Sequence, residues 1–175
     1  MISNEEMKIV TNQIGRVPEN ALDVVKYCSY GLPTVIKSYP LLDGKPFPTL
    51  YWLTCPFLRD EISKMESDGW IKRYEEMISK SSEFSNLQTK AHELAKKDVI
   101  DLLQDDALKV KFTGGMGGIR DFNHVKCLHM HVAYHLGGIE NPIGRSVLSK
   151  ISQTECKSGI CLEWSMQNGI FFDCG

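Results

Sequence analysis

Three short runs of β-branched and aromatic residues, separated by turn residues, constrain the fold of this chain most strongly. The runs are Leu22–Cys28, Thr34–Tyr39 and Thr49–Thr54. Turn residues fill Ser29–Pro33 between the first two runs, and Asp43-Gly44 is a strong turn signal before the third. We therefore predict a three-stranded antiparallel meander over about residues 22–54.

Helical patterns flank the predicted sheet. A first helix is expected to begin at Ser3 or Asn4 and to end at Gly15, because side-chain oxygens cap helix starts and glycine ends helices. Apolar residues then recur at helical spacing in segments 56–69, 70–79, 84–103, 123–136 and 142–151. The sequence of 175 residues therefore predicts a single α+β domain, in which five or six helices pack with a small antiparallel sheet.

A cysteine-containing tail is expected from about residue 154. Cys156 and Cys161 do not have the spacing of a common zinc knuckle, so we interpret this tail as mobile, with reactive thiols. The turn signal at Gln167–Gly169 is compatible with a hairpin there.

Charge and hydropathy exclude several classes of protein. The net charge is −2, so the basic excess that is typical of nucleic-acid-binding proteins is missing. The N-terminal residues are polar and acidic, and no stretch approaches the roughly 18–20 apolar residues of a membrane span. We expect a cytoplasmic protein without a membrane partner, and a homodimer is compatible with the sequence. Because cytoplasmic thiols stay reduced, the six cysteines are expected to be free thiols, metal ligands or redox groups.

Cys55 is a candidate for chemistry because it lies where a predicted strand meets a predicted helix. Proline favours the first helical position, so Pro56 places Cys55 at or beside the N-cap. Backbone N–H groups and the helix dipole stabilise an anion there, which lowers a thiol pKa as a nucleophile or a metal thiolate requires. A small buried residue at the end of a strand is the alternative interpretation.

Four of the five histidines lie within residues 124–135. On a helix, Cys127, His131 and His135 share one face at i,i+4 spacing, close enough to chelate one ion. His129 falls at the margin of the apolar face, where we expect a ring nitrogen to be hydrogen-bonded. A polar helix face that happens to hold histidines is the alternative. The apolar face consists of Val125, Leu128, Val132 and Leu136.

The glycine-rich segment 113–118 is a candidate anion site. Gly115, Gly117 and Gly118 would let backbone N–H groups converge, and the start of the following helix would add its dipole. Arg120 and Lys126 would add positive charge, and the ligand would be a small anionic molecule. No Gly-Lys-Ser/Thr follows, so the segment is not a Walker loop. A flexible loop is the alternative interpretation.

Five stretches carry a resemblance to a known family: Gly15–Pro18, Cys28–Pro33, Asp43–Pro56, Val125–His129 and Asn141–Pro142. With these stretches the chain resembles a bacterial family of uncharacterised proteins, domain of unknown function 501. The resemblance extends to about residue 145, and the Asp43–Pro56 block is its most specific part. It implies that Cys28, Cys55, Cys127 and His129 belong together, with a cysteine near the C-terminus, where Cys174 lies. The resemblance thus favours His129 as the partner of Cys127, whereas helical spacing favours His131.

The sequence leaves three functions open. The leading hypothesis is a metalloprotein in which Cys28, Cys55 and Cys127 converge on zinc or an iron–sulfur cluster, completed by Cys174 or a histidine such as His131. Three protein ligands would leave an open catalytic position. The second hypothesis is a metal-independent enzyme with Cys55 as nucleophile, His129 as base and the glycine loop as a site for a phosphate-like substrate. The third is a non-catalytic interaction module with buried thiols.

Overall fold

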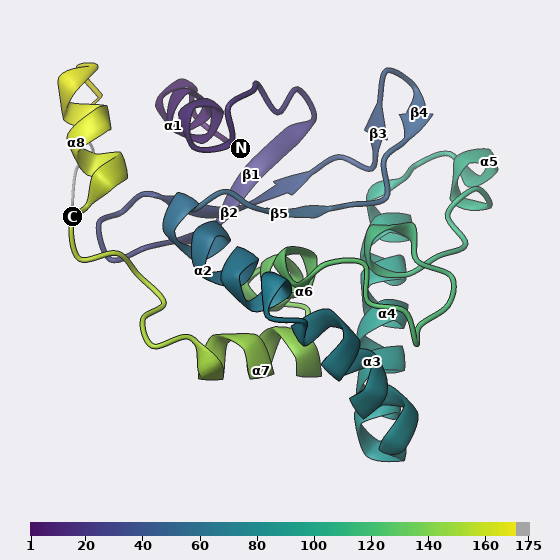
Figure 1. Ribbon diagram of the computed structural model, residues 1–175. Coiled ribbons are helices and arrows are strands. Elements are labelled where there is room, and N and C mark those ends of the chain that lie inside the picture. Colours follow the sequence, from purple (N-terminus) through teal and green to yellow (C-terminus); the bar gives the residue numbers. More distant parts are fainter. Residues whose placement is uncertain (171–175) are drawn as a thin grey trace.

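The computed structural model describes residues 1–170 and shows an α+β fold built around a small sheet (Figure 1). The predicted meander is confirmed, since three strands pair antiparallel in the order β1-β2-β5. A hairpin of two short strands lies between β2 and β5 and turns at Asp43-Gly44. The strands are β1 (Ala21–Tyr27), β2 (Pro33–Ser38), β3 (Leu41–Leu42), β4 (Lys45–Pro46) and β5 (Tyr51–Leu53).

Eight α-helices lie within residues 1–170, and six of them correspond to predicted segments. Those six are α1 (Asn4–Ile14), α2 (Pro56–Ser67), α3 (Trp70–Lys80), α4 (Ser82–Leu102), α6 (Leu128–Leu136) and α7 (Pro142–Lys150). The other elements are α5 (Asp106–Lys109), α8 (Ile160–Gln167) and the 3-10 turn η1 (Met116–Gly118). The hairpin considered around Gln167–Gly169 is wrong, because the residues before this turn form the helix α8, which ends at Gln167. None of the helices in the described part combines the length and apolar character that a bilayer span requires.

Local capping sets the limits of α1 as the sequence predicts. The Ser3 hydroxyl accepts from the Glu6 N–H at 3.2 Å, and the Glu6 carboxylate accepts from the Ser3 N–H at 2.7 Å. This reciprocal pair satisfies two N–H groups that have no partner within the helix. Gly15 ends α1 with a φ of 75°, a left-handed conformation that glycine adopts without strain.

Successive side chains of β2 enter different apolar clusters, as the alternation of a strand requires. Ile36 packs with Val10 and Val24 beneath α1. Val35 joins the main core, to which β5 and α6 contribute Leu53 and Val132. Figure 1 shows α1 on one side of the strands and α2, α6 and α7 on the other.

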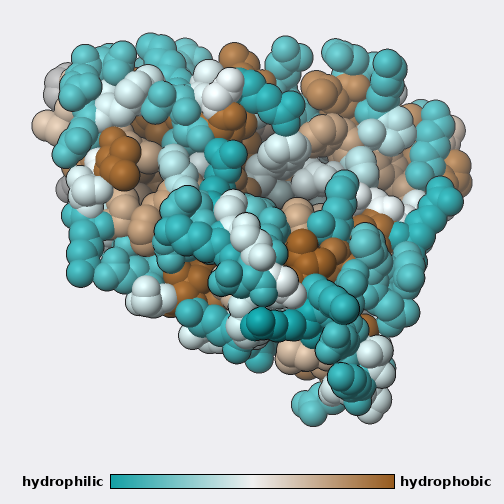
Figure 2. Space-filling model, viewed as in Figure 1, coloured by the Kyte–Doolittle hydropathy of each residue, from teal (hydrophilic) through white to brown (hydrophobic). Residues whose placement is uncertain are grey.

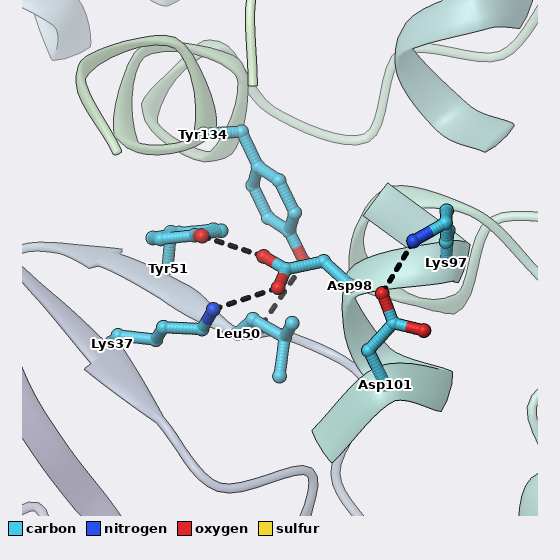
Figure 3. A network of polar contacts seen from close by, with 7 residues as sticks. All are labelled: Lys37, Leu50, Tyr51, Lys97, Asp98, Asp101 and Tyr134. Atoms are coloured by element: carbon cyan, nitrogen blue, oxygen red, sulfur yellow. Dashed lines mark hydrogen bonds and ion pairs between the residues drawn. The ribbon is translucent and has the colours of Figure 1, made fainter. Parts of the chain in front are cut away.

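A polar network attaches the sheet to α4 (Figure 3). Asp98 of α4 accepts a hydrogen bond from Tyr51 at 2.6 Å and pairs with Lys37 at 2.7 Å. Nearby, the hydroxyl of Tyr134 on α6 accepts from the Leu50 N–H at 3.0 Å. The start of β5 is therefore held by two helices, α4 and α6.

Candidate functional site

The segment that carries Cys127 and four histidines is not a single helix. Helix α6 begins at Leu128, and Cys127 is its N-cap residue with an extended backbone (φ −163°, ψ 152°). The Val125 N–H donates to Glu75 at 3.0 Å and the Leu128 N–H donates to Glu66 at 2.5 Å. Carboxylates from other helices thus accept from these two N–H groups. Residues 125–127 therefore do not need to form a further helical turn before α6 to satisfy their hydrogen bonds. The predicted helix 123–136 is therefore wrong over residues 123–127 and confirmed over 128–136.

Glu66, Cys127 and His129 form a compact group in which one ligand atom from each lies within 4.8 Å of the others. His129 contacts Glu66 through Nδ1 at 3.1 Å and the Arg59 carbonyl through Nε2 at 3.0 Å. Nε2 also lies 3.3 Å from the hydroxyl of Ser63, which can donate or accept a hydrogen bond. The hydrogen-bonded His129 ring is confirmed, and His129 is the histidine that lies beside Cys127, as the family pattern favours. Glu66 has no spacing relationship in the sequence that would signal its role.

His131 lies in the core and not beside Cys127. Its ring is fully buried, and neither ring nitrogen has a hydrogen-bond partner among the described residues. It stands edge-on to His92, with ring centroids 6.1 Å apart. Burial lowers the pKa of His131 to about 3. The structure therefore does not support His131 as a metal ligand, because the helical register used to predict it does not include Cys127.

Four thiols line one cavity of about 300 Å³ at the end of the sheet: Cys28, Cys55, Cys156 and Cys161. Cys28 lies in the turn after β1, where its N–H donates to the Leu32 carbonyl at 2.9 Å. Cys55 is the N-cap residue of α2, and the neighbouring Thr54 N–H donates to Thr34 of β2 at 2.9 Å. Figure 1 shows α8, the β1–β2 turn and the start of α2 at this same end of the molecule.

Contacts far apart in sequence hold the segment after α7 against the β1–β2 turn. The Ser29 N–H donates to Glu155 at 3.1 Å, and the Tyr30 hydroxyl donates to the Lys157 carbonyl at 3.0 Å. Gln13 of α1 donates to the Cys161 sulfur at 3.5 Å. The predicted free tail is therefore wrong for Cys156 and Cys161, which belong to the cavity. Cys174, expected as a ligand from the family pattern, lies outside the described residues.

Burial controls the acidity of these thiols. It raises the pKa of Cys55 to about 11, although the N–H groups of Leu58 and Phe57 lower that pKa. Burial also raises the pKa of Cys127 and of Cys161. The N-cap position of Cys55 is confirmed, but the expected lowering of its pKa is wrong because desolvation outweighs the helix terminus. A protonated thiol is a poor nucleophile, which disfavours a Cys55 nucleophile with His129 as its base.

Cys127 does not share a cavity with Cys28 and Cys55. It lines a separate cavity of about 780 Å³ together with His129. Cys55 is the N-cap residue of α2, whereas Glu66, the neighbour of Cys127, lies near the end of the same helix. Eleven helical residues rise about 16 Å, so the backbones of Cys55 and Glu66 are about that far apart. The predicted convergence of these three cysteines on one site is therefore wrong.

The glycine loop is a packing element in which three of the N–H groups already have acceptors within the protein. The Gly115 N–H donates to Ile119 at 2.8 Å, and the Met116 N–H donates to Nδ1 of His92 at 3.1 Å. The Gly118 N–H donates back to Gly115 at 2.9 Å. A Cβ atom on Gly115 would lie 2.5 Å from the His92 ring. The predicted anion site of Gly115, Gly117, Gly118 and Arg120 is therefore not supported. Lys126, the remaining residue of the prediction, lines the same cavity as Cys127.

Comparison with known families gives one match. The model of a family described as "Protein of unknown function (DUF501)" matches residues 24–149. The chain belongs to this family. No curated protein and no solved structure matches it.

The residues that match the DUF501 model include only two of the four cysteines that line the smaller cavity. The match includes Cys28 and Cys55, as well as Cys127 and His129 of the second cavity, and it ends before Cys156 and Cys161. The cavity wall that α8 and its preceding loop provide therefore comes from residues beyond the DUF501 match.

Proposed function

We propose that this DUF501 protein binds an iron–sulfur cluster through Cys28, Cys55, Cys156 and Cys161. The observation that carries the proposal is that four of the six cysteines line one cavity of about 300 Å³. Four cysteine thiolates are the usual ligand set of [2Fe–2S] and [4Fe–4S] clusters. Two of these cysteines come from the sheet end and two from the segment after α7, so the cluster would join the tail to the rest of the fold.

The spacing of the thiols favours a cluster over a single zinc ion. Four sulfurs at ~2.3 Å from one zinc ion lie about 4 Å from each other. Within residues 1–170, no three of these thiols lie within 4.8 Å of one another. A cluster places several iron and sulfide ions between its ligands, so it suits thiols that stand further apart around an open cavity.

The surroundings of the cavity suit ligand sulfurs. Gln13 donates to Cys161, and hydrogen bonds to ligating sulfurs stabilise a reduced cluster and tune its potential. Thr34 lines the same cavity, and its buried hydroxyl has no hydrogen-bond partner among the described residues. A sulfide or thiolate in the cavity would accept from that hydroxyl. Cluster binding would also release the thiol protons that burial otherwise retains.

Metal analysis of protein purified without oxygen, or reconstituted with iron and sulfide, tests this proposal. We expect iron and acid-labile sulfide in equal amounts, with visible absorption that Cys28→Ala, Cys55→Ala, Cys156→Ala or Cys161→Ala abolishes or strongly reduces. Cys127→Ala is the matched control and should keep the cluster. Zinc without iron would contradict the cluster, and loss in Cys127→Ala but not in Cys156→Ala or Cys161→Ala would contradict the ligand set. A Cys174→Ala variant reports whether that cysteine contributes.

Zinc bound by Glu66, Cys127 and His129 is the second candidate, because their ligand atoms lie within 4.8 Å of one another. Three protein ligands would leave the fourth position of a tetrahedral zinc ion open, as in catalytic sites. The arrangement requires one His129 nitrogen to exchange its hydrogen bond for the metal. Zinc content that falls in Cys127→Ala and His129→Ala, and stays unchanged in Cys28→Ala, would support this candidate.

A further inference from the structure

The larger cavity, of about 780 Å³, runs along β5, which is an edge strand of the sheet. The segment after α1 provides Arg16, α2 provides Arg59, and the segment before α6 provides Lys126. Three cationic side chains from three separate parts of the chain therefore line one concave site. The volume falls within the range of ligand sites for small molecules, about 300–1,000 Å³.

These cations have no carboxylate partner within residues 1–170. Asp60 is the one carboxylate that lines the cavity, and it pairs with Lys64 at 2.8 Å. Arg59 donates to the Gln13 carbonyl at 2.9 Å, and the Arg16 guanidinium lies 5.0 Å from the centre of the Trp52 ring. Both contacts restrain an arginine without neutralising it, which lowers the entropy lost when an anion binds.

The rest of the cavity wall is mainly apolar. Trp52, Leu53 and Pro56 line it from the sheet and the start of α2, and Met130 and Ala133 line it from α6. Figure 2 shows a mainly hydrophilic face on which hydrophobic side chains appear in separate places, without one continuous patch. This face therefore does not show the large apolar surface that would mark a protein interface. The concave shape of the larger cavity suits a small ligand instead.

We infer that this cavity binds a small organic phosphate. The phosphate would lie among Arg16, Arg59 and Lys126, since guanidinium groups bind phosphate oxygens in pairs and lysine adds a point charge. The apolar body of the ligand would pack against Trp52 and Met130. This inference is independent of the iron–sulfur proposal, because none of the four cysteines of the smaller cavity lines this one.

Calorimetric titration of the purified full chain with phenyl phosphate tests the inference. The probe carries a phosphate and an apolar ring, while inorganic phosphate and phenol each carry one of the two. We expect saturable binding of phenyl phosphate, weaker binding of inorganic phosphate and no measurable binding of phenol. Lys126→Ala and Arg16→Gln should each weaken phenyl phosphate binding by about tenfold.

Lys111→Ala is the matched control, since Lys111 is exposed and does not line the cavity. Lys126 is also exposed and does not line the smaller cavity, so its removal should leave the fold and the iron content unchanged. Absence of saturable binding at about 10 mM phenyl phosphate would overturn the inference. Equal affinities in Lys126→Ala, Arg16→Gln and Lys111→Ala would overturn it as well.

Discussion

Tyr51 donates a 2.6 Å hydrogen bond to Asp98 and thereby connects β5 to α4 (Figure 3). The other carboxylate oxygen of Asp98 pairs with Lys37, and the side chains of this pair are only 21% (Lys37) and 22% (Asp98) exposed. Burial and the bond to Asp98 raise the pKa of Tyr51, so its hydroxyl keeps the proton that it donates. One carboxylate thus joins two adjacent strands to a helix that lies far along the chain.

Asp98→Asn should lower the free energy of unfolding by about 1–3 kcal/mol, because it weakens a partly buried hydrogen bond and leaves Lys37 without its partner. Asp101→Asn is the control. Its pair with Lys97 is equally short, at 2.6 Å, but the side chains are 71% (Lys97) and 56% (Asp101) exposed, so we expect a change within about 0.5 kcal/mol. Urea unfolding measures both, and equal losses would show that the Asp98 network does not hold the sheet to α4.

Acid should destabilise the protein through its two buried histidines. Burial lowers the pKa of His92 to about 4 and that of His131 to about 3, below the value of about 6.5 in an unfolded chain. Their neutral forms therefore contribute stability above pH 6.5, and that stability is lost as the pH falls toward 4 and then 3. Denaturant unfolding between pH 7 and pH 4 should show this loss, at up to about 1.4 kcal/mol per pH unit for each histidine.

The same two histidines should respond differently to substitution. His131→Leu removes a buried ring without hydrogen-bond partners in the described residues, so stability at pH 7 should be unchanged or slightly higher and acid sensitivity should fall. His92→Leu should cost about 1–3 kcal/mol, because the Met116 N–H and Gln88 lose their partner. A larger loss for His131→Leu than for His92→Leu at pH 7 would contradict the assignment of His131 as a ring without stabilising hydrogen bonds.

Gly115→Ala should destabilise the protein by more than Gly138→Ala. A Cβ atom on Gly115 would meet the His92 ring at 2.5 Å, so the buried ring and its hydrogen bonds must shift. Gly138 has a φ of 103° but open space around it, so alanine there should cost about 1–2 kcal/mol of backbone strain. Thermal melting compares the two variants. A smaller loss for Gly115→Ala would contradict the packing role assigned to the glycine loop.

Cys55 should be slow to alkylate in metal-free protein. With a pKa of about 11, its thiolate fraction at pH 8 is about 100-fold below that of a thiol with a pKa near 9. Iodoacetamide labelling followed by peptide mass spectrometry should show little modification of Cys55 at pH 8 and a steep increase toward pH 10. Labelling at pH 8 faster than that of free cysteine would instead indicate an activated nucleophile.

Local sequence signals predicted the elements whose limits depend on near neighbours. The Ser3 and Glu6 cap of α1, the Asp43-Gly44 turn and the meander all rest on interactions over a few residues or on strand alternation. The start of α6 could not be predicted this way. The N–H groups of Leu128 and Val125 bond to Glu66 and Glu75, 50 or more residues earlier. These bonds keep Cys127 extended, although its spacing to His131 is helical.

By itself, the sequence determined the α+β class, the order of its elements and the family pattern that pairs Cys127 with His129. Tertiary structure alone decided how the five cysteines within residues 1–170 divide between cavities. Cys156 and Cys161 join Cys28 and Cys55 because Glu155 and Lys157 bond to the β1–β2 turn, more than 120 residues away in the chain. Such contacts leave no periodicity in the sequence, since their strength depends on the burial and direction of groups that only the folded chain brings together.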